Sequence, residues 1–418
     1  MVSEIALDIR RAAEERASEL DTGPSLAGGY ASIALFFTYL DQALSGQGFD
    51  DVALEMLEKA MEVTAEIRVL PSLYSGFSGV AWAVEHLRGR LFEESDDEDA
   101  AAETVPALTE LLATHPWRGD YDLINGLVGL GVYALERLPR VGGRECLELV
   151  VERLAEAAEW SSVGATWKTS PSLLSELERQ KFPDGNYNLG LAHGVPGVVG
   201  LLALAQAHGV ECRELLYGAA SWLLSRKRPS TCETLFGYTE PAGGNASEAS
   251  RLAWCYGDLG IAASLMVAAS ALGEGRWYDQ ALEIASKATD RTLENSGVAD
   301  AGLCHGSGGV SHLFNRLYQA TDDPRFLAAA RVWIDHTLRR FRSGEGFGGY
   351  QARLPDESSE LTWQNHAGFL MGSTGIGLAM LAAASDQEPE WDRVLLVSGR
   401  PVEAPVGARE ATGPAPPM

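Results

Sequence analysis

A short glycine-containing pattern occurs seven times along the chain, and it restricts the possible folds more than any other feature. Each copy is a glycine turn followed by a run of small and apolar residues. A second small residue lies three positions after the aligned glycine, and it is glycine in every copy except the first, which has Ser32. The aligned glycines are Gly29, Gly76, Gly126, Gly194, Gly257, Gly306 and Gly372. Such repeats are typical of folds in which one structural unit is stacked many times.

Each interval between these glycines has room for two helices of different character. The first helix is apolar almost all round, as in 195–207 and 260–272, which predicts burial on most sides. The second is amphipathic, with examples at 51–67, 144–160, 211–225, 278–294 and 324–341. Seven buried helices that alternate with seven amphipathic ones predict an all-α fold, an α/α toroid (barrel) with an inner and an outer ring. An open solenoid shows the same alternation, but neither end of this chain is an obvious polar cap.

In a closed ring all seven turns lie on one rim, so residues just before the glycines converge at one mouth. Long segments at 162–188, 226–251 and 342–368 are rich in Gly, Pro, Ser and Asn, and long loops are often functional. We expect one toroid domain over residues 1–398. Residues 399–418 carry Pro, Gly and Ala without periodicity, which predicts a disordered C-terminal tail.

Composition narrows the class of protein further. The net charge is -25 and no basic face is visible, which argues against a nucleic-acid partner. An acidic surface can attract a basic peptide, although solubility alone also accounts for it. No segment reaches the roughly 20 apolar residues of a membrane span, and the first 20 residues contain no signal-peptide core. We therefore expect a cytoplasmic protein that does not span a membrane.

Two of the five cysteines occupy the same place in adjacent turns. Cys255 and Cys304 each lie two positions before an aligned glycine, and His305 follows Cys304 directly. Sulfur and nitrogen are the ligands that zinc prefers, and catalytic zinc sites keep a fourth position open. These three residues therefore predict a zinc site at the mouth, where coordination would deprotonate a substrate thiol. The alternative is that the two cysteines are merely small buried residues.

Four further residues are placed near the same mouth by the repeat. His193 has the register of His305 and is either another ligand or a general acid–base. Asp122 could orient His193, or could instead be a helix N-cap. Arg251 could stabilise an anionic intermediate, or could form a surface salt bridge. Tyr256 directly follows Cys255.

Four motifs in order, on the sevenfold repeat, carry a resemblance. They are YDLINGL at 121–127, LAHG at 191–194, WCYG at 254–257 and CHG at 304–306. With them the sequence resembles the class I lanthipeptide (lantibiotic) cyclase family, roughly from Leu20 to Ala384. The resemblance implies an α/α toroid. It also implies that Cys255, Cys304 and His305 hold Zn²⁺, and that His193, Asp122, Arg251 and Tyr256 serve acid–base and intermediate-stabilising roles.

The resemblance further implies a reaction and its partners. A cysteine thiolate of the substrate peptide, held on zinc, attacks the β-carbon of a dehydroalanine or dehydrobutyrine residue. The resulting enolate is protonated at the α-carbon, for which His193 is our candidate donor, and a (methyl)lanthionine thioether ring results. The substrate is then a dehydrated precursor peptide with leader and core. Because no segment resembles a dehydratase, we expect a separate dehydratase as a partner, and an exporter besides.

Two other functions fit parts of the pattern. Protein prenyltransferase β-subunits are α/α barrels with a zinc-bound substrate thiol, but they lack the paired CHG and WCYG turns. A non-cyclising relative, either a zinc protein that forms thiol or glutathione adducts or a peptide-binding scaffold, would keep the repeat. The LAHG and WCYG forms favour the cyclase.

Overall fold

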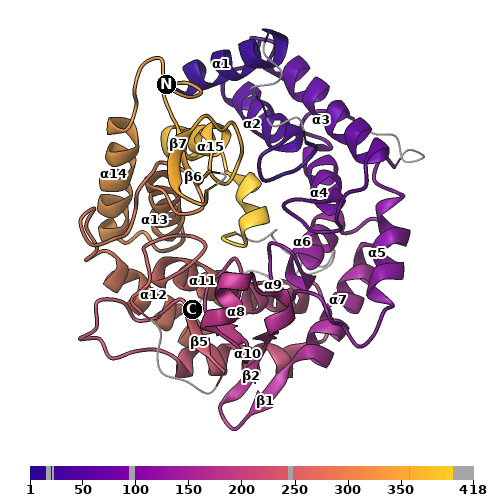
Figure 1. Cartoon of the computed structure of the whole chain (residues 1–418), viewed down its shortest axis with the longest axis vertical. Coiled ribbons are helices and arrows are strands. Elements are labelled where there is room, and N and C mark those ends of the chain that lie inside the picture. Colours follow the sequence, from indigo (N-terminus) through magenta and orange to yellow (C-terminus); the bar gives the residue numbers. More distant parts are fainter. Residues whose placement is uncertain (16–19, 21–22, 94–98, 243–247, 357, 399–418) are drawn as a thin grey trace, which may run out of the picture.

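The computed structural model describes residues 1–398 except 16–19, 21–22, 94–98, 243–247 and 357. The tail expected at 399–418 lies outside the described residues. Within them, seven helices form an inner ring and seven an outer ring, so the predicted all-α toroid is confirmed (Figure 1). The inner helices are α2 (Tyr30–Ala43), α4 (Phe77–Leu87), α6 (Leu127–Arg137), α9 (Val195–Ala207), α11 (Asp258–Leu272), α13 (Ser307–Thr321) and α15 (Ser373–Ala384).

The outer helices pack against the inner ones in chain order, and α1 near the amino terminus covers α15 near the other end. They are α1 (Val2–Glu15), α3 (Phe49–Glu66), α5 (Thr104–Leu112), α7 (Gly143–Ala157), α10 (Arg213–Ser225), α12 (Gly275–Ala288) and α14 (Pro324–Arg339). Five of them overlap the predicted amphipathic segments. Their starts agree within about three residues, whereas the helices expected at 144–160 and 278–294 end earlier, at Ala157 and Ala288.

Every inner helix begins directly after one of the seven aligned glycines, which is its N-cap residue. The close approach of two backbone segments explains the repeat. A Cβ atom on Gly194 would overlap the carbonyl oxygen of Asn188, six residues earlier. Gly309, three positions into its repeat, packs in the same way on the carbonyl oxygen of Leu303. Only glycine leaves room for this crossing. In the first repeat Ser32 donates a hydrogen bond to the Gly29 carbonyl, at 2.7 Å.

Backbone hydrogen bonds join neighbouring turns and close the ring. The N–H groups of Trp254 and Cys255 both donate to the carbonyl of Cys304, at 3.1 and 3.3 Å. The seventh turn is joined to the first, because Phe369 N–H donates to the carbonyl of Ala27 at 2.9 Å. An open solenoid would leave these two turns apart. The chain is therefore a closed toroid, with its seven turns on one face.

Short strands lie in the three segments that the sequence presented as loops, although the first strand lies just before the first of these segments. β1 (Glu159–Ser161) pairs with β2 (Gly164–Thr166), and β6 (Ala352–Pro355) pairs with β7 (Leu361–Gln364). β3 (Lys168–Thr169), β4 (Asn186–Asn188) and β5 (Thr239–Pro241) form a small antiparallel sheet. Its strands are two or three residues long, too short for an alternating pattern to reveal them. The short helices η2 (Pro171–Leu173) and α8 (Glu176–Lys181) lie between β3 and β4.

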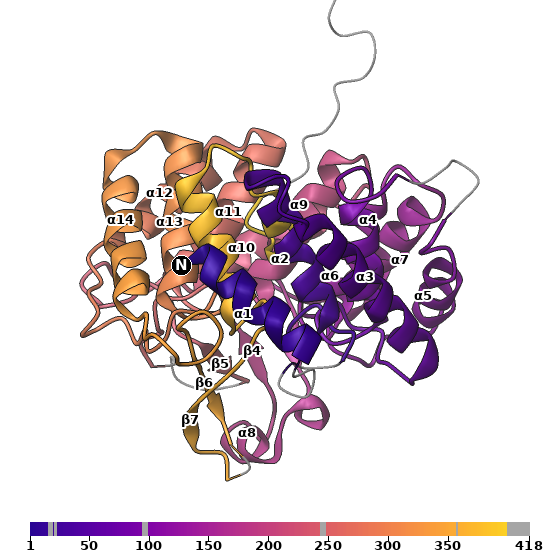
Figure 2. The ribbon, with the colours of Figure 1, turned by 90° about the horizontal axis from the view of Figure 1, so that it is seen from above.

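Figure 2 shows β4 to β7 and α8 together on one side of the toroid. They precede the turns of α9, α11 and α15 in the chain, so they surround the face on which the turns lie. Among the described residues, no helix combines the length and apolar character needed to cross a membrane.

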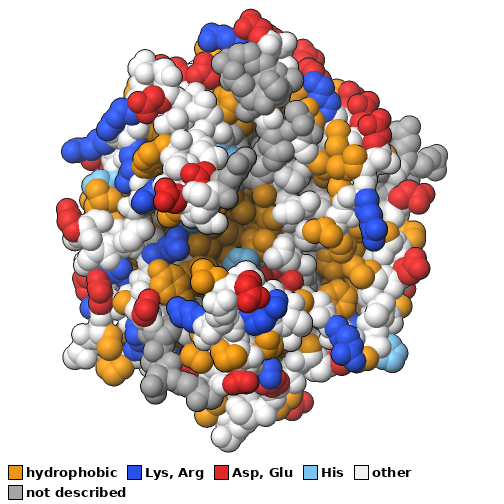
Figure 3. Space-filling view, viewed as in Figure 1, with side chains coloured by type: hydrophobic (Ala, Val, Ile, Leu, Met, Phe, Trp, Pro, Cys, Tyr) orange, Lys and Arg blue, Asp and Glu red, His pale blue; other side chains and the backbone are white. Residues whose placement is uncertain are grey.

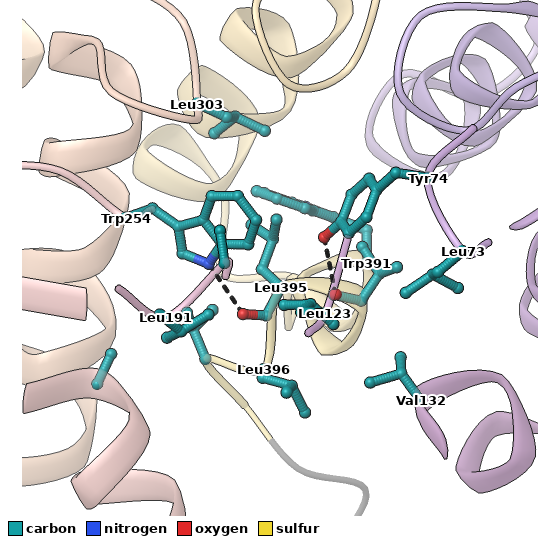
Figure 4. Close-up of a cluster of buried hydrophobic side chains, with 14 of the residues drawn as sticks. Leu73, Tyr74, Leu123, Val132, Leu191, Trp254, Leu303, Trp391, Leu395 and Leu396 are labelled. Atoms are coloured by element: carbon teal, nitrogen blue, oxygen red, sulfur yellow. Dashed lines mark hydrogen bonds between the residues drawn. The ribbon is translucent and has the colours of Figure 1, made fainter. Parts of the chain in front are cut away.

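The short helix η3 (Glu390–Leu395) enters the centre of the ring and forms its floor (Figure 1). Tyr74 donates its hydroxyl hydrogen bond to the carbonyl of Val394, and the indole N–H of Trp254 donates to Leu395, each at 2.9 Å (Figure 4). Trp254 directly precedes Cys255, so its hydrogen bond to Leu395 of η3 holds the turn that contains Cys255.

Candidate metal centre

The turns that open α11 and α13 bring the two predicted cysteines together. Cys255 comes from the first turn, and Cys304 and His305 come from the second. The sulfur atoms and one imidazole nitrogen lie within 4.8 Å of one another. Cys255 is buried, whereas Cys304 and His305 are half-buried and reach the mouth. In the described part of the chain this is the one group of three that could hold a metal.

The two thiols do not ionise alike. A hydrogen bond with Cys304 lowers the pKa of Cys255 well below its ordinary value, and His305 and Arg251 act in the same direction. The same hydrogen bond, together with burial, raises the pKa of Cys304. The thiolate form is therefore favoured at Cys255 rather than at Cys304. Two sulfurs and one imidazole, with a side open to the mouth, match the donor set of a catalytic zinc site.

A buried carboxylate stands behind the histidine of this cluster. Asp300 is 1% exposed, and its Oδ2 atom lies 3.8 Å from Nε2 of His305. Its Oδ1 atom accepts the N–H of Gly302 at 3.0 Å, but buried Oδ2 accepts no hydrogen bond from any described residue. Nε2 faces this carboxylate, which leaves Nδ1 of His305 for a metal. Metal-bound histidines commonly donate their other N–H to such a carboxylate.

His193 and Asp122 form a second pair at the mouth. Nδ1 of His193 lies 2.6 Å from Oδ2 of Asp122, and the imidazole is 37% exposed. Burial favours the neutral ring, but the hydrogen bond and the charge of Asp122 outweigh it and raise the pKa of His193. Oδ1 of Asp122 accepts the N–H of Asn125 within the turn, at 2.7 Å, while Gly126 is the helix N-cap. Asp122 thus orients His193 and does not cap α6.

Aromatic side chains extend the wall from this pair toward Arg251. The ring of Tyr256 stacks beside His193, with centroids 6.1 Å apart, and Asn188 donates to the Tyr256 hydroxyl at 3.1 Å. The guanidinium of Arg251 lies 5.9 Å from the centre of the Tyr238 ring. It forms no ion pair with any described residue, so the surface salt bridge considered from sequence is not seen. All seven predicted residues therefore lie around one mouth.

Figure 3 shows this mouth as a hollow near the middle of the face, with hydrophobic side chains at its bottom. Basic and histidine side chains lie at its edge. A peptide can reach the cluster from the face with the hollow, because Cys304, His305 and His193 are all partly exposed.

Sequence reasoning missed four polar residues of the site, namely Asp120, Asn188, Tyr238 and Asp300. Burial and the charge of Asp122 raise the pKa of Asp120 to about 6, beside His193. A signal for three of them existed. Asp120, Asn188 and Asp300 lie six positions before an aligned glycine, as does Arg251. At Asp120, Asn188 and Arg251 the backbone at this position crosses the glycine of the next helix, which places the residue in the turn beside the site.

The fold and site define a class, the closed α/α toroids with a Cys–Cys–His cluster on the rim of glycine turns. Residues 21–396 match the family model described as "Lanthionine synthetase C-like protein". The chain belongs to this family, which confirms the resemblance seen in its motifs.

Individual relatives agree with this membership. The chain is 27% identical over 245 residues to "Nisin biosynthesis protein NisC" of Lactococcus lactis subsp. lactis, over 54% of this chain and 57% of that protein. It is 27% identical over 170 residues to "Glutathione S-transferase LANCL1" of Danio rerio, over 40% of this chain and 38% of that protein. Both matches thus cover less than two thirds of the relative.

A solved structure has the same fold along nearly the whole chain. The structure titled "Nisin cyclase" superimposes with a TM-score of 0.72 at 21% sequence identity, over 95% of this chain and 96% of that one. At this identity the likeness establishes the toroid.

Proposed function

We propose that this protein is a zinc-dependent lanthipeptide cyclase that joins cysteine thiols of a dehydrated peptide to dehydroalanine or dehydrobutyrine residues. One observation carries the proposal: Cys255, Cys304 and His305 form an S₂N cluster at an open mouth, facing the oriented pair His193–Asp122. Membership of the lanthionine synthetase C-like family supports it. A structural zinc site would more often have four protein ligands and would not need an acid–base pair beside it.

Cys255, Cys304 and His305 would hold the zinc ion, which when bound supplies an open position where a thiol loses its proton at neutral pH. Asp300 would fix the ring orientation of His305 through Nε2. We assign Asp300 as a positioning residue, because it reaches the substrate only through His305. The buried Trp254–Leu395 hydrogen bond holds the Cys255 turn in place from the floor side.

The remaining residues would stabilise the negative charge of the enolate and supply the proton that the α-carbon gains. In the addition, the peptide sulfur forms a bond to the β-carbon, the carbon–carbon double bond opens, and the α-carbon gains one proton. Asp122 raises the pKa of His193 and so favours the protonated ring, and the same carboxylate holds the ring through its Nδ1 atom. Arg251 forms no ion pair with a carboxylate of the described residues, and its positive charge beside Cys255 and Cys304 is suited to an enolate oxygen. Tyr256 packs beside the ring of His193 and limits its rotation.

The partners follow from the substrate. A dehydrated precursor with leader and core requires a separate dehydratase upstream, and an exporter for the product. Both would act in the cytoplasm or at its membrane, so we propose a cytoplasmic location. The prenyltransferase reading is set aside, because the family match covers residues 21–396.

A second function has one specific observation in its favour. The matched Danio rerio protein carries the name "Glutathione S-transferase LANCL1". The same cluster could hold the thiol of glutathione and add it to a dehydroamino acid or another electrophile. The two functions differ in whether the reacting thiol belongs to the peptide or to a separate molecule.

Mass spectrometry separates the two functions. The purified protein is incubated with a peptide that contains one cysteine and one dehydroalanine, with and without glutathione, and is then treated with iodoacetamide. Cyclisation leaves the peptide mass unchanged, because the addition releases no atoms. It also protects the thiol from alkylation, because the sulfur has become part of a thioether. Adduct formation raises the mass by one glutathione. A zinc-loaded protein that does neither, with several such peptides, would contradict both functions.

A further inference from the structure

A second recess opens beside the metal cluster, with a volume of about 230 Å³. Its lining includes Ala301, Arg340, Arg342, Glu345, Tyr350 and Trp363. These residues come from the turn before α13, from the end of α14 and the segment after it, and from β7. The recess thus lies where the β6–β7 hairpin meets the rim.

The recess and the candidate metal centre share one wall. Ala301 lines the recess, and the preceding residue, Asp300, lies 3.8 Å from His305 on the other side. The charge of Asp300 also acts on the guanidinium of Arg340 across this wall. A peptide held at the cluster would therefore have neighbouring residues within reach of the recess.

The two arginines of the recess form no ion pair with an acidic side chain of the described residues, and Asp300 acts on Arg340 only across the wall. Arg340 is half-buried, and its guanidinium makes no hydrogen bond or ion pair with any described residue. Within the described part of the chain, the Arg342 side chain donates to the main-chain carbonyls of Arg339 and Phe341, at 2.9 and 2.8 Å, and to no carboxylate. Glu345 is the one carboxylate in the lining, and it is exposed. The chain has a net charge of -25, so two neighbouring arginines that pair with no carboxylate of the described residues form a local excess of positive charge.

The remaining lining is aromatic. Trp363 is 51% exposed on β7, and buried Tyr350 is anchored by its hydroxyl on the carbonyl of Thr337. Guanidinium groups bind carboxylates in a planar, often bidentate arrangement, and an exposed indole offers an apolar contact beside it. The arrangement fits an acidic residue of a peptide strand, and it is too small for a folded partner.

We propose that this recess binds a carboxylate of the substrate peptide, from a residue close in sequence to the cysteine that reacts at the metal centre. Arg340 and Arg342 pair with the carboxylate, and Trp363 covers the adjoining part of the peptide. The recess then selects which cysteine enters the site. This inference rests on the proposed function, because it takes the ligand to be the peptide that is cyclised.

The test combines a double variant, R340Q/R342Q, with paired peptides. Each peptide contains one dehydroalanine, one cysteine and a single glutamate, placed one to four residues before or after the cysteine. Its partner has glutamine at that position. R331Q is the matched control, because Arg331 is an exposed arginine on the same helix, α14. Melting temperature and zinc content of each variant check that folding and the cluster are intact.

We expect the double variant to raise KM about tenfold for the best glutamate peptide, with kcat within twofold. It should leave KM for the glutamine partner unchanged, and R331Q should behave as the wild type. An equal rise in KM for the glutamate peptide and its glutamine partner would mean that the two arginines support the structure of the site, and the proposal would be wrong. An unchanged KM for every glutamate peptide would equally overturn it.

Fluorescence anisotropy of labelled peptides keeps this test separate from the proposed function. If the wild type prefers the glutamate peptide and the double variant loses that preference, the recess binds a carboxylate even when no ring forms. Carboxylate-dependent binding without any ring formation would contradict the cyclase assignment and support the binding pocket. Cyclisation of both partners with equal KM and equal affinity would instead retain the cyclase and remove the pocket.

Discussion

Replacing Asp300 with asparagine should weaken zinc binding while leaving the toroid folded. The two side chains have the same shape, and the asparagine oxygen can still accept the N–H of Gly302 that Oδ1 now accepts. The change falls on Oδ2, which is buried 3.8 Å from Nε2 of His305. An amide NH₂ there offers a donor to a nitrogen that must itself donate when Nδ1 binds the metal.

The size of the effect follows from this geometry. Loss of such an outer partner typically lowers metal affinity 10- to 100-fold, which is about 1.4 to 2.7 kcal/mol. We expect a value toward the upper end, because Asp300 is 1% exposed and water cannot replace the lost acceptor. Competition with a chromogenic chelator at fixed pH measures the zinc dissociation constant directly.

The control is Asp290→Asn, at a 68% exposed carboxylate that pairs with Lys287 and, among the described residues, forms no ion pair with any residue of the cluster. It should keep the wild-type zinc affinity. An affinity of Asp300→Asn within twofold of the wild type would refute the positioning role. A collapse of the helical circular dichroism signal in that variant would refute it also, since it would place Asp300 among the residues needed for folding.

Three further outcomes follow from the site. Cys304→Ala should lose zinc and cyclisation but keep its helices, as metal analysis and circular dichroism would show; global unfolding would mean a structural metal. His193→Ala should keep zinc and lose about 100-fold or more in the rate of ring formation, measured by thiol alkylation; loss of the metal would make it a fourth ligand. Asp122→Asn removes the charge that raises the pKa of His193. A general acid works only while protonated, so its rate falls as pH rises through this pKa, and the fall should begin at lower pH in Asp122→Asn; an unshifted pH–rate profile would exclude His193 as the proton donor.

The toroid could be predicted because the same glycine turn recurs before each inner helix and can be recognised in the sequence. The glycines before the inner helices recur wherever two backbone segments cross, so aligning them gives both the number of units and the rim on which residues meet. Cys255, Cys304, His305 and His193 were found in this way, since each lies one or two positions before a glycine. The pairing of His193 with Asp122 was one of two alternatives at the level of sequence, and the hydrogen bond between them decides it against a helix N-cap.

Other parts of the site carry a weaker signal or none. Asp300 lies six positions before its glycine, and that column also contains leucine and glycine, so its polar character shows in only part of the repeat. The floor helix η3 lies after the last repeat and has no register to place it. Its contacts with Tyr74 and Trp254 join residues that are more than 100 positions apart. Such contacts depend on the finished ring and cannot be read from local pattern.

The second glycine of the repeat permits a test of how folding geometry and the metal site are linked. Gly309 packs on the carbonyl oxygen of Leu303, and Gly79 packs on that of Leu73 in the equivalent place of another repeat. A Cβ at either position overlaps backbone that cannot move as a flexible side chain would. Alanine at each should therefore cost about 1 to 3 kcal/mol of stability, measured by denaturant unfolding.

The two variants should differ at the cluster. Leu303 directly precedes Cys304, so the shift that relieves Gly309→Ala displaces a metal ligand, whereas Leu73 is remote from every ligand in the chain. We expect Gly309→Ala to weaken zinc binding at least tenfold and Gly79→Ala to leave it within twofold, at similar loss of stability. Equal zinc affinity in the two variants would show that the cluster tolerates movement of its turn, and the close backbone crossing would then serve the fold alone.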